Sequence, residues 1–403
     1  MEGDFDPVAR LREHAAGREA AGLRRRLVPR QPDGGLLDLA SNDYLGLCGH
    51  PRLAEAAAEA ARTWGTGATG SRLVTGTTAL HEELEAALAE FAGARSALVF
   101  SSGYLANLAA VTALTTALGS DGGETLIVSD AGNHASLIDG CRLARGRGAR
   151  LQVTPHGDLD AVARALRERR ERAALIVTDA VFSVGGDLAP VAELHALARR
   201  HGALLLVDEA HSFGVLGDGG RGVAHDAGLG DQPDIVRTIT LSKSLSGQGG
   251  AVLGAPEVRQ ALVDTGRGFI FDTGLAPPAA GAALAALAIV REHPELPEGA
   301  RQATRRLASI AAGLGLRATP PDAAVTSVIL GDPRLAVAAQ RTCGEHGVHV
   351  GCFRPPSVPP GESCLRLTGR ASLTEIDFAT ASRALGAVRD HSRIPEKSGG
   401  RAP

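Results

Sequence analysis

Ala203-Leu-Leu-Leu-Val-Asp-Glu-Ala-His211 is a short apolar run that ends in charged and polar residues. A run of this length and composition is typical of a strand that is buried on both faces of a parallel sheet. A second stretch, Thr240-Leu-Ser-Lys-Ser-Leu-Ser-Gly-Gln-Gly-Gly250, follows a β-branched run in the same way. The two stretches therefore predict that Asp208 and Lys243 lie at the ends of buried strands.

Runs of the same kind recur on both sides of these two, mostly separated by helical patterns. The full set lies at residues 97–100, 125–128, 151–153, 175–178, 204–207, 235–240 and 251–254. Such alternation of strands and helices predicts an α/β fold, with a large domain built on a mainly parallel seven-stranded sheet and helices on both of its faces.

The chain is expected to divide into four segments. They are an N-terminal arm over residues 1–50, the large domain over 51–290, a smaller C-terminal α+β domain over 291–391 and a disordered tail over 392–403. The pattern in the arm predicts a helix over Pro7–Arg26. In the smaller domain, strands are predicted over Val325–Leu330 and Leu365–Leu367.

Polar residues follow many of the predicted strands of the large domain. They are Ser101–Asn107, Asp130–His134, Asp179–Ser183, Asp208–His211 and Lys243. The carboxyl ends of parallel strands meet at one edge of a sheet, and ligands bind in the crevice outside that edge. We therefore expect these side chains to converge on one site.

Lys243 and Asp208 together predict pyridoxal 5′-phosphate (PLP) as the cofactor. A lysine amine forms an imine with the aldehyde, and a carboxylate keeps the pyridine nitrogen protonated, which makes the ring an electron sink. His211, beside Asp208, can hydrogen-bond the phenolic oxygen. Each residue alone can also be explained without a catalytic role. Lysines at strand ends are usually solvated, and Asp208 can cap the next segment. A nucleotide site is excluded, because the chain has no Gly-x-x-x-x-Gly-Lys-Ser/Thr loop.

His134 and the segment Ser102-Gly103-Tyr104 extend this candidate site. His134 can stack on the cofactor ring, or it can be a structural histidine at a helix start. Ser102, Gly103 and Tyr104 lead into a helix whose free backbone N–H groups can hold a phosphate, although a plain strand-to-helix turn explains them equally well. The glycine-rich segment 65–76 is either an anion site or a flexible connector.

The composition excludes several classes of protein. A chain of 403 residues, 44% of them hydrophobic, can bury a large core. With 42 basic and 45 acidic residues, neither a nucleic acid nor an anionic membrane is indicated as a partner. The five cysteines are scattered without a CxxC pair, so neither a disulfide framework nor a metal site is expected. The acidic N-terminus and the lack of a span of transmembrane length favour a cytoplasmic location.

Together these motifs resemble the α-oxoamine synthase family of fold type I PLP-dependent enzymes along nearly the whole chain. The segments that carry the resemblance are Ser41–Leu47, the glycine-rich segment with its continuation to His81, Asn133–Ser136, Asp208–His211 and Thr240–Lys243. The resemblance implies a homodimeric fold type I PLP-dependent transferase that joins an amino acid to an acyl thioester. Within the family, Arg354–Pro359 followed by Leu365–Leu367 is most similar to the members that use L-alanine and a pimeloyl thioester in biotin biosynthesis.

The resemblance also implies a role for each cofactor residue. Lys243 forms the imine and removes the α proton, Asp208 pairs with the ring nitrogen, and His134 stacks on the ring. His211 and Ser183 are expected near the ring oxygen. The residues expected to bind the phosphate are Gly103, Tyr104, Thr240 and Thr273 of the partner subunit.

On the substrate side, Arg366 is expected to hold the amino acid carboxylate and Asn42 to lie near the substrate. Arg24 matches a basic position that is associated with the acyl substrate. The chain departs from the family pattern at Gly185, Asp179, Asp272 and Arg370. None of these departures is expected to touch the cofactor core, but those near the acyl entrance can change the thioester accepted.

Three alternatives stay open. The chain can be a related synthase that uses glycine or serine, similar to 2-amino-3-ketobutyrate CoA ligase. It can be a secondary-metabolite acyltransferase with another acyl donor. It can also be a cofactor-binding protein without turnover, although the sequence has no DNA-binding extension or basic patch. The sequence leaves open whether coenzyme A or acyl carrier protein carries the acyl group.

Overall fold

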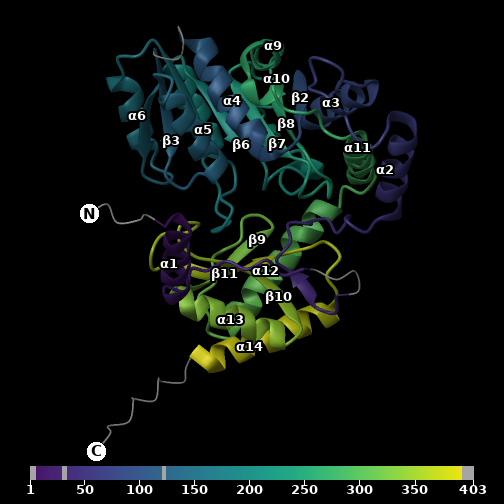
Figure 1. The fold of residues 1–403 in the computed structure, drawn as a ribbon, viewed down its shortest axis with the longest axis vertical. Helices are drawn as coiled ribbons and strands as arrows, with labels where there is room; N and C mark the ends of the chain where they lie inside the picture. The colour runs from purple at the N-terminus through teal and green to yellow at the C-terminus, as the bar shows by residue number, and fades with distance from the viewer. Residues whose placement is uncertain (1–5, 30–33, 120–123, 393–403) are drawn as a thin grey trace, which may run out of the picture.

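Two sheets, each packed against helices, make up the part of the chain that the computed structural model describes, residues 6–29, 34–119 and 124–392 (Figure 1). The larger sheet lies in the upper half of Figure 1 and the smaller sheet in the lower half. The tail predicted over 392–403 lies outside the described residues, apart from Ser392 at the end of the last helix. The predicted division into an arm and two domains stays a prediction.

The larger sheet has seven strands in the order β2-β8-β7-β6-β5-β3-β4. Their bounds are β2 (Ser96–Phe100), β3 (Thr125–Asp130), β4 (Arg150–Thr154), β5 (Ala173–Asp179), β6 (Leu204–Asp208), β7 (Ile235–Thr240) and β8 (Gly250–Gly254). Neighbouring strands are parallel except at β8, which is antiparallel to both β2 and β7. The segment 241–249 between β7 and β8 is too short for the crossover that parallel strands need. The predicted mainly parallel seven-stranded sheet is confirmed.

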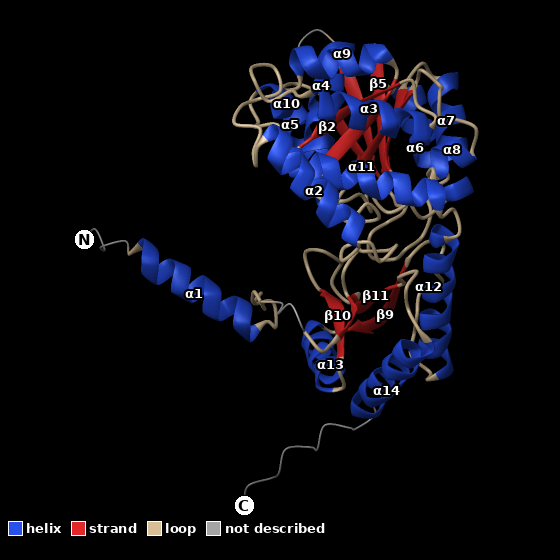
Figure 2. Cartoon of the chain, turned by 90° about the vertical axis from the view of Figure 1, so that its right-hand side faces the viewer, coloured by secondary structure: helices blue, strands red, loops and turns tan. Residues whose placement is uncertain are grey.

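Helices cover both faces of this sheet, as the alternating pattern predicted (Figure 2). In β6, Leu205 packs into one buried cluster with α6 and α7, while Leu206 packs into another with α4, α5 and α9. Because both faces are covered, successive strand residues are all apolar. The helices are α2 (Pro51–Trp64), α3 (Ala79–Ala92), α4 (Gly103–Leu118), α5 (Ala135–Arg145), α6 (Leu159–Glu168), α7 (Val191–Arg200), the short η2 (Asp218–Gly220) and α8 (Val223–Asp226), α9 (Pro256–Thr265), α10 (Arg267–Ile270) and α11 (Pro277–Glu292).

The smaller sheet has the order β1-β10-β11-β9. Its strands are β1 (Leu37–Leu39), β9 (Val325–Gly331), β10 (Val348–Phe353) and β11 (Ser363–Thr368), and its helices are α12 (Leu296–Gly313), α13 (Pro333–Glu345) and α14 (Glu375–Ser392). The two strands predicted in this region are confirmed as β9 and β11. The sequence pattern did not show that β1 pairs in parallel with β10 from the far end of the chain.

The helix predicted over Pro7–Arg26 is shorter than expected. It forms α1 (Pro7–Ala20) and ends before Gly22, whose φ of 69° is a left-handed conformation typical of the residues that follow helices. Figure 2 shows α1 extending away from the rest of the protein, and its carboxyl end is held by Arg334, which donates to the Ala20 carbonyl at 2.5 Å. Within the described ranges, no helix combines the length and the apolar character that a bilayer crossing requires.

Candidate active site

Lys243 and His211 meet at the carboxyl edge of the larger sheet. Lys243 follows β7 and His211 follows β6, which is paired with β7. The lysine Nζ lies 2.7 Å from His211 Nε2, and His211 Nδ1 lies 2.5 Å from the hydroxyl of Tyr44. The ends of two of the predicted strands, β6 and β7, therefore meet at Lys243.

Burial and neighbouring charges set the protonation of this pair. Burial, together with the positive charges of Lys243 and Arg366, holds the pKa of His211 well below its usual value. The neutral His211 ring can therefore accept a hydrogen bond from the lysine. Burial lowers the pKa of Lys243 to about 8. The negative charge of Asp208 opposes this shift, and the positive charge of Arg366 adds to it. A lysine with this pKa is partly neutral near pH 7, as imine formation requires.

Asp208 is held in place by hydrogen bonds to both of its carboxylate oxygens. It is buried at the end of β6, where Oδ1 accepts from the backbone N–H of Ala210 at 2.8 Å. Oδ2 accepts from Nδ2 of Asn107, on α4, at 2.6 Å. Asn107 is itself fixed, because its Oδ1 accepts from the Thr238 hydroxyl at 2.6 Å. A buried carboxylate in a fixed position suits the proposed partner of a pyridinium nitrogen.

His134 is connected to the same network. It caps the start of α5, and its Nδ1 lies 2.7 Å from the Ser136 hydroxyl. Asn107 donates to that hydroxyl at 2.8 Å, so a single buried amide links His134 to Asp208. Although the residue as a whole is exposed, loss of water around its ring lowers the pKa of His134, which favours the neutral form. The sequence pointed to the segment containing Asn107 but gave no sign of its central place, because its partners lie on three elements that are distant in sequence: Asp208 ends β6, Thr238 lies within β7 and Ser136 lies on α5.

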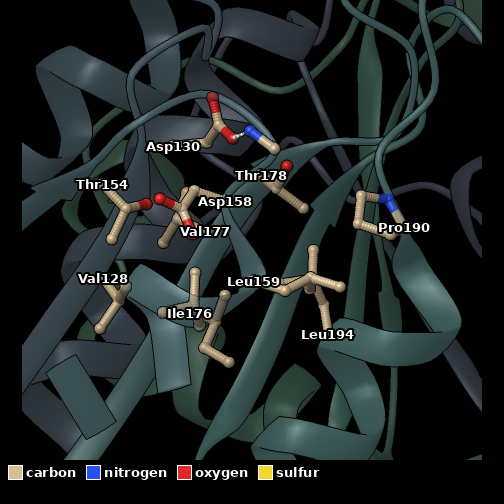
Figure 3. A pocket seen from close by; sticks show the side chains of 12 residues that line it. Val128, Asp130, Thr154, Asp158, Leu159, Ile176, Val177, Thr178, Pro190 and Leu194 are labelled. Atoms are coloured by element: carbon tan, nitrogen blue, oxygen red, sulfur yellow. Dashed lines mark hydrogen bonds between the residues drawn. The ribbon is translucent and has the colours of Figure 1, made fainter. Parts of the chain in front are cut away.

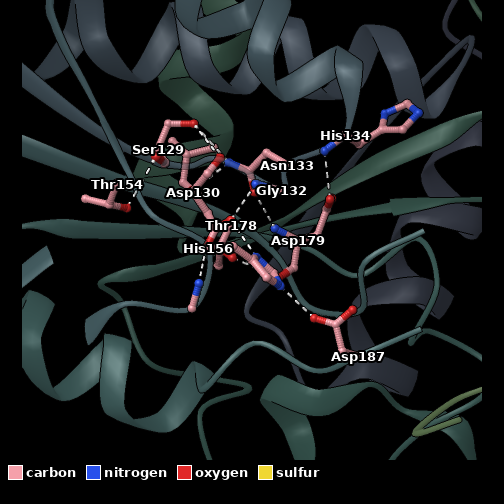
Figure 4. A network of polar contacts seen from close by, with 12 residues as sticks. Ser129, Asp130, Gly132, Asn133, His134, Thr154, His156, Thr178, Asp179 and Asp187 are labelled. Carbon is pink, nitrogen blue, oxygen red and sulfur yellow. Dashed lines mark hydrogen bonds and ion pairs between the residues drawn. The ribbon is translucent and has the colours of Figure 1, made fainter. Parts of the chain in front are cut away.

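Two of the four departures from the family pattern lie closer to this site than expected. Asp179 is the register partner of Asp208 across β5 and β6, and its Oδ2 accepts the backbone N–H of His134 at 2.7 Å (Figure 4). Asp179 therefore contacts a residue of the predicted cofactor site, while the expectation that no departure touches the cofactor core stays a prediction. Asp272 accepts a hydrogen bond from Ser101, the residue before Ser102.

The protonation of Asp179 is also shifted. Burial, and next the nearby charge of Asp208, raise its pKa well above the usual value for a carboxyl group. The neutral acid is therefore favoured beside the Asp208 carboxylate.

The predicted phosphate residues form a cradle at the start of α4. Ser102 caps this helix and accepts from the backbone N–H of Leu105 at 3.1 Å. A Cβ atom on Gly103 would lie 3.0 Å from Cβ of Thr240, so Gly103 allows the end of β7 to approach the helix closely. Tyr104 lies half exposed beside this approach. The structure thus brings Ser102, Gly103, Tyr104 and Thr240 together.

Thr273 follows Asp272, which accepts the hydrogen bond from Ser101. It pairs through an isolated antiparallel bridge with Ser71 of the glycine-rich segment. The role predicted for Thr273 of the partner subunit stays a prediction, because the structure contains one chain. The glycine-rich segment therefore contacts the residues that follow Asp272, since the backbone N–H of Gly274 also donates to the Gly70 carbonyl at 2.9 Å.

Among the predicted substrate residues, Arg366 connects the smaller sheet to the segment that follows β5 of the larger sheet. It lies on β11 of the smaller sheet and is 5% exposed. Its Nη2 donates to Asn42 Oδ1 at 2.8 Å, and its Nη1 donates to the backbone carbonyl of Ser183 at 3.1 Å. The predicted substrate residues Arg366 and Asn42 are therefore in contact with each other and with the segment after β5.

Arg24 is not brought to this group. Its guanidinium forms an ion pair with Glu19, and both side chains are about half exposed. It lies in the segment that follows α1. Its predicted contact with the acyl substrate stays a prediction.

A separate pocket lies beneath the strand ends. Figure 3 shows it between β3, β5 and α6, lined mainly by apolar side chains, among them Val128, Ile176 and Leu159. With about 10 Å³ of space it can hold roughly one water molecule. It is too small for a cofactor, so the candidate site is assigned to the residues that meet around Lys243.

The residues around Lys243 fit PLP. They include an amine of lowered pKa, a fixed carboxylate at the end of the neighbouring strand, and a histidine that Ser136 and Asn107 link to that carboxylate. The helix start at Gly103 offers N–H groups and a close approach that a side chain would block.

Comparison with known proteins agrees with this assignment. The model of the aminotransferase class I and II family matches residues 35–385. An 8-amino-7-oxononanoate synthase of Mycolicibacterium gilvum (strain PYR-GCK) is 57% identical over 381 residues, which cover 94% of this chain and 97% of that protein.

Solved structures show the same fold. A variant of serine palmitoyltransferase from S. paucimobilis with a bound PLP–myriocin aldimine is 29% identical, with a TM-score of 0.86, and the match covers 96% of this chain and 99% of that one. The 8-amino-7-oxononanoate synthase of Francisella tularensis is 26% identical, with a TM-score of 0.73, over 89% of this chain and 98% of that one.

Proposed function

Because the chain belongs to the aminotransferase class I and II family and, within it, to the 8-amino-7-oxononanoate synthases, we propose a reaction for it. The proposed reaction joins L-alanine to a pimeloyl thioester. The products are 8-amino-7-oxononanoate, carbon dioxide and the free thiol, and the reaction is a decarboxylative Claisen condensation in biotin biosynthesis. The protein is a PLP-dependent acyltransferase with the fold type I architecture that the sequence predicted. The observation that carries the proposal is the Lys243 amine beside Asp208 and His211 at two paired strand ends.

Lys243 is the group that moves protons at the α carbon of the amino acid. Bound PLP supplies an electron sink that stabilises negative charge at the α carbon, both after proton removal and after loss of carbon dioxide. Lys243, with a pKa of about 8, takes the α proton and later returns a proton to the same carbon. His211 accepts a hydrogen bond from the amine and holds it in position.

The other residues bind and orient. Asp208 would keep the pyridine nitrogen of bound PLP protonated, and Asn107 fixes this carboxylate in one direction. His134 would stack on the ring. Ser102, Gly103, Tyr104 and Thr240, at the start of α4, would hold the phosphate.

Arg366 is proposed to bind the carboxylate of L-alanine. Its guanidinium is already oriented, because Nη2 donates to Asn42 Oδ1 and to the Ala40 carbonyl and Nη1 donates to the Ser183 carbonyl, so binding a carboxylate costs little further ordering.

We also propose a homodimer, in which Thr273 of the partner subunit completes the phosphate site, and a cytoplasmic location. The acyl donor is a pimeloyl thioester of coenzyme A or of acyl carrier protein. Among the described residues, no helix is both long enough and apolar enough to cross a membrane.

The test is to supply purified protein and PLP with pimeloyl-CoA and, in parallel, L-alanine, glycine or L-serine, and to identify products by mass spectrometry. We expect 8-amino-7-oxononanoate from L-alanine and at most traces of product from the other two amino acids. A product from glycine but not from L-alanine would overturn the assignment.

A further inference from the structure

His156 bridges two carboxylates in the segment between β4 and α6. Its Nδ1 lies 2.9 Å from Asp130 Oδ1, and its Nε2 lies 2.7 Å from Asp187 Oδ2 (Figure 4). A carboxylate accepts hydrogen bonds and cannot donate them, so each ring nitrogen must carry a proton to satisfy both contacts. The geometry therefore requires a positively charged imidazolium.

The two carboxylates belong to two different segments of the active site. Asp130 ends β3, and its oxygens also accept the backbone N–H of Gly132 at 2.6 Å and of Gly157 at 2.8 Å. The chain reaches His134 directly after this turn. Asp187 closes the loop after β5, since its carbonyl accepts the N–H of Phe182 at 3.0 Å.

The loop between Phe182 and Asp187, which follows β5 of the larger sheet, accepts hydrogen bonds from two strands of the smaller sheet. The Ser327 hydroxyl, on β9, donates to the carbonyl of Val184 at 2.6 Å. Arg366, on β11, donates to the carbonyl of Ser183 at 3.1 Å. The position of this loop therefore helps to set the position of Arg366.

Two glycines leave the space that the bridge needs. A Cβ atom on Gly132 would lie 2.7 Å from His156 Nδ1, and one on Gly185 would lie 2.3 Å from Asp187 Oδ1. Gly185 is one of the departures from the family pattern, and here it admits the carboxylate that His156 contacts.

We propose that His156 is a positioning residue, whose imidazolium holds the segment after β3, which carries His134, against the loop after β5, which supports Arg366. Its effect on L-alanine rests on the proposed function, since it acts through the arginine assigned to the carboxylate. The bridge itself does not depend on that assignment.

The bridge is expected to weaken as the pH rises. Burial opposes the charge on His156, but the hydrogen bonds and charges of Asp130 and Asp187, the ionisable groups that face it, outweigh burial and raise its pKa. A histidine whose pKa is higher in the folded state stabilises the fold fully below its unfolded pKa. That stability is lost as the pH rises through the folded pKa.

The first experiment compares His156→Gln with the wild type. At pH 6.5 the variant should raise KM for L-alanine about fivefold, the upper end for a partly exposed ion pair. The ratio of the two KM values should fall towards one by about pH 9, where the wild-type ring has lost its charge. The matched control is His195→Gln, which removes a 2.9 Å contact with Asp234 and should leave KM unchanged, because Asp234 precedes β7 and Lys243 follows the other end of that strand.

A second readout needs neither cofactor nor turnover. In the protein without PLP, thermal unfolding should give a lower Tm for His156→Gln than for the wild type at pH 6.5, with the difference vanishing by about pH 9. A KM ratio near one at pH 6.5, or a Tm difference that does not change with pH, would overturn the proposal. If no amino acid is condensed by the wild type, the proposed function fails, and the Tm series still decides the role of His156.

Discussion

Asn107 Nδ2 donates to Asp208 Oδ2 at 2.6 Å, and the same amide nitrogen donates to the Ser136 hydroxyl at 2.8 Å. The two hydrogens of one side-chain amide thus orient the carboxylate and, through Ser136, the ring of His134. All of these groups except His134 are buried. Removing one of them would leave a buried polar partner without a hydrogen bond, which is costly in free energy.

Asn107→Ala should therefore weaken PLP binding. Removing a buried hydrogen-bond partner costs about 1–3 kcal/mol, and we expect a loss of PLP affinity on the order of tenfold. Titration of PLP followed by absorbance measures it. Thr115→Ala on the same helix is the control, because its hydroxyl contacts only backbone carbonyls of α4. Equal affinity in Asn107→Ala and the wild type would show that the amide does not support the site.

Asp179→Asn should leave the free energy of unfolding nearly unchanged, whereas Asp179→Ala should lower it. The raised pKa favours the neutral acid, which asparagine resembles in shape, and its oxygen can still accept the N–H of His134. We expect asparagine to change the free energy of unfolding by less than about 1 kcal/mol and alanine to lower it by about 1–3 kcal/mol. Urea unfolding measures both values. Equal destabilisation by the two variants would contradict the neutral form.

The same carboxyl group predicts a pH dependence. Because its folded pKa is above its unfolded value, the stability that it contributes is present below the unfolded pKa and is lost as the pH rises through the folded pKa. Asp179→Asn should remove this loss, so the difference in unfolding free energy between the variant and the wild type should shift in favour of the variant as the pH rises from 4 to 8. A difference that is constant with pH would be the contrary result.

Arg366→Lys should raise KM for L-alanine more than it lowers kcat. A lysine keeps the charge but cannot make a planar bidentate contact, nor reach both Asn42 and the Ser183 carbonyl in the same way. We expect KM to rise about tenfold or more. Steady-state kinetics with varied L-alanine decide the point, and an unchanged KM would remove Arg366 from the carboxylate site.

The sequence predicted the framework of the site well, because strand ends and buried runs are local patterns. The apolar stretch before Asp208 and the β-branched stretch before Lys243 were enough to place both residues at one sheet edge. The contacts of Tyr44 with His211 and of β1 with β10 could not be predicted, since they join segments that are distant in sequence. The role of Asp179 was missed for the same reason, because strand order decides which ends are neighbours.

The protonation of Lys243 predicts the pH dependence of cofactor capture. Only the neutral amine attacks an aldehyde, and the pKa of Lys243 is about 8. In protein freed of PLP, the rate of PLP capture at fixed PLP concentration should rise as the pH increases towards 8 and level off above it. Stopped-flow absorbance measures this rate. A rise that continues to pH 10 would show an amine of ordinary pKa.

The central claim is that Lys243 carries the cofactor, and the chain makes the test unusually direct because its only lysines are Lys243 and Lys397. Borohydride reduction of the PLP-loaded protein, followed by proteolysis and mass spectrometry, locates the attachment. The account predicts a phosphopyridoxyl group on the peptide that contains Lys243 and none in Lys243→Ala. A label on Lys397, or an unlabelled Lys243 peptide in protein saturated with PLP, would contradict it.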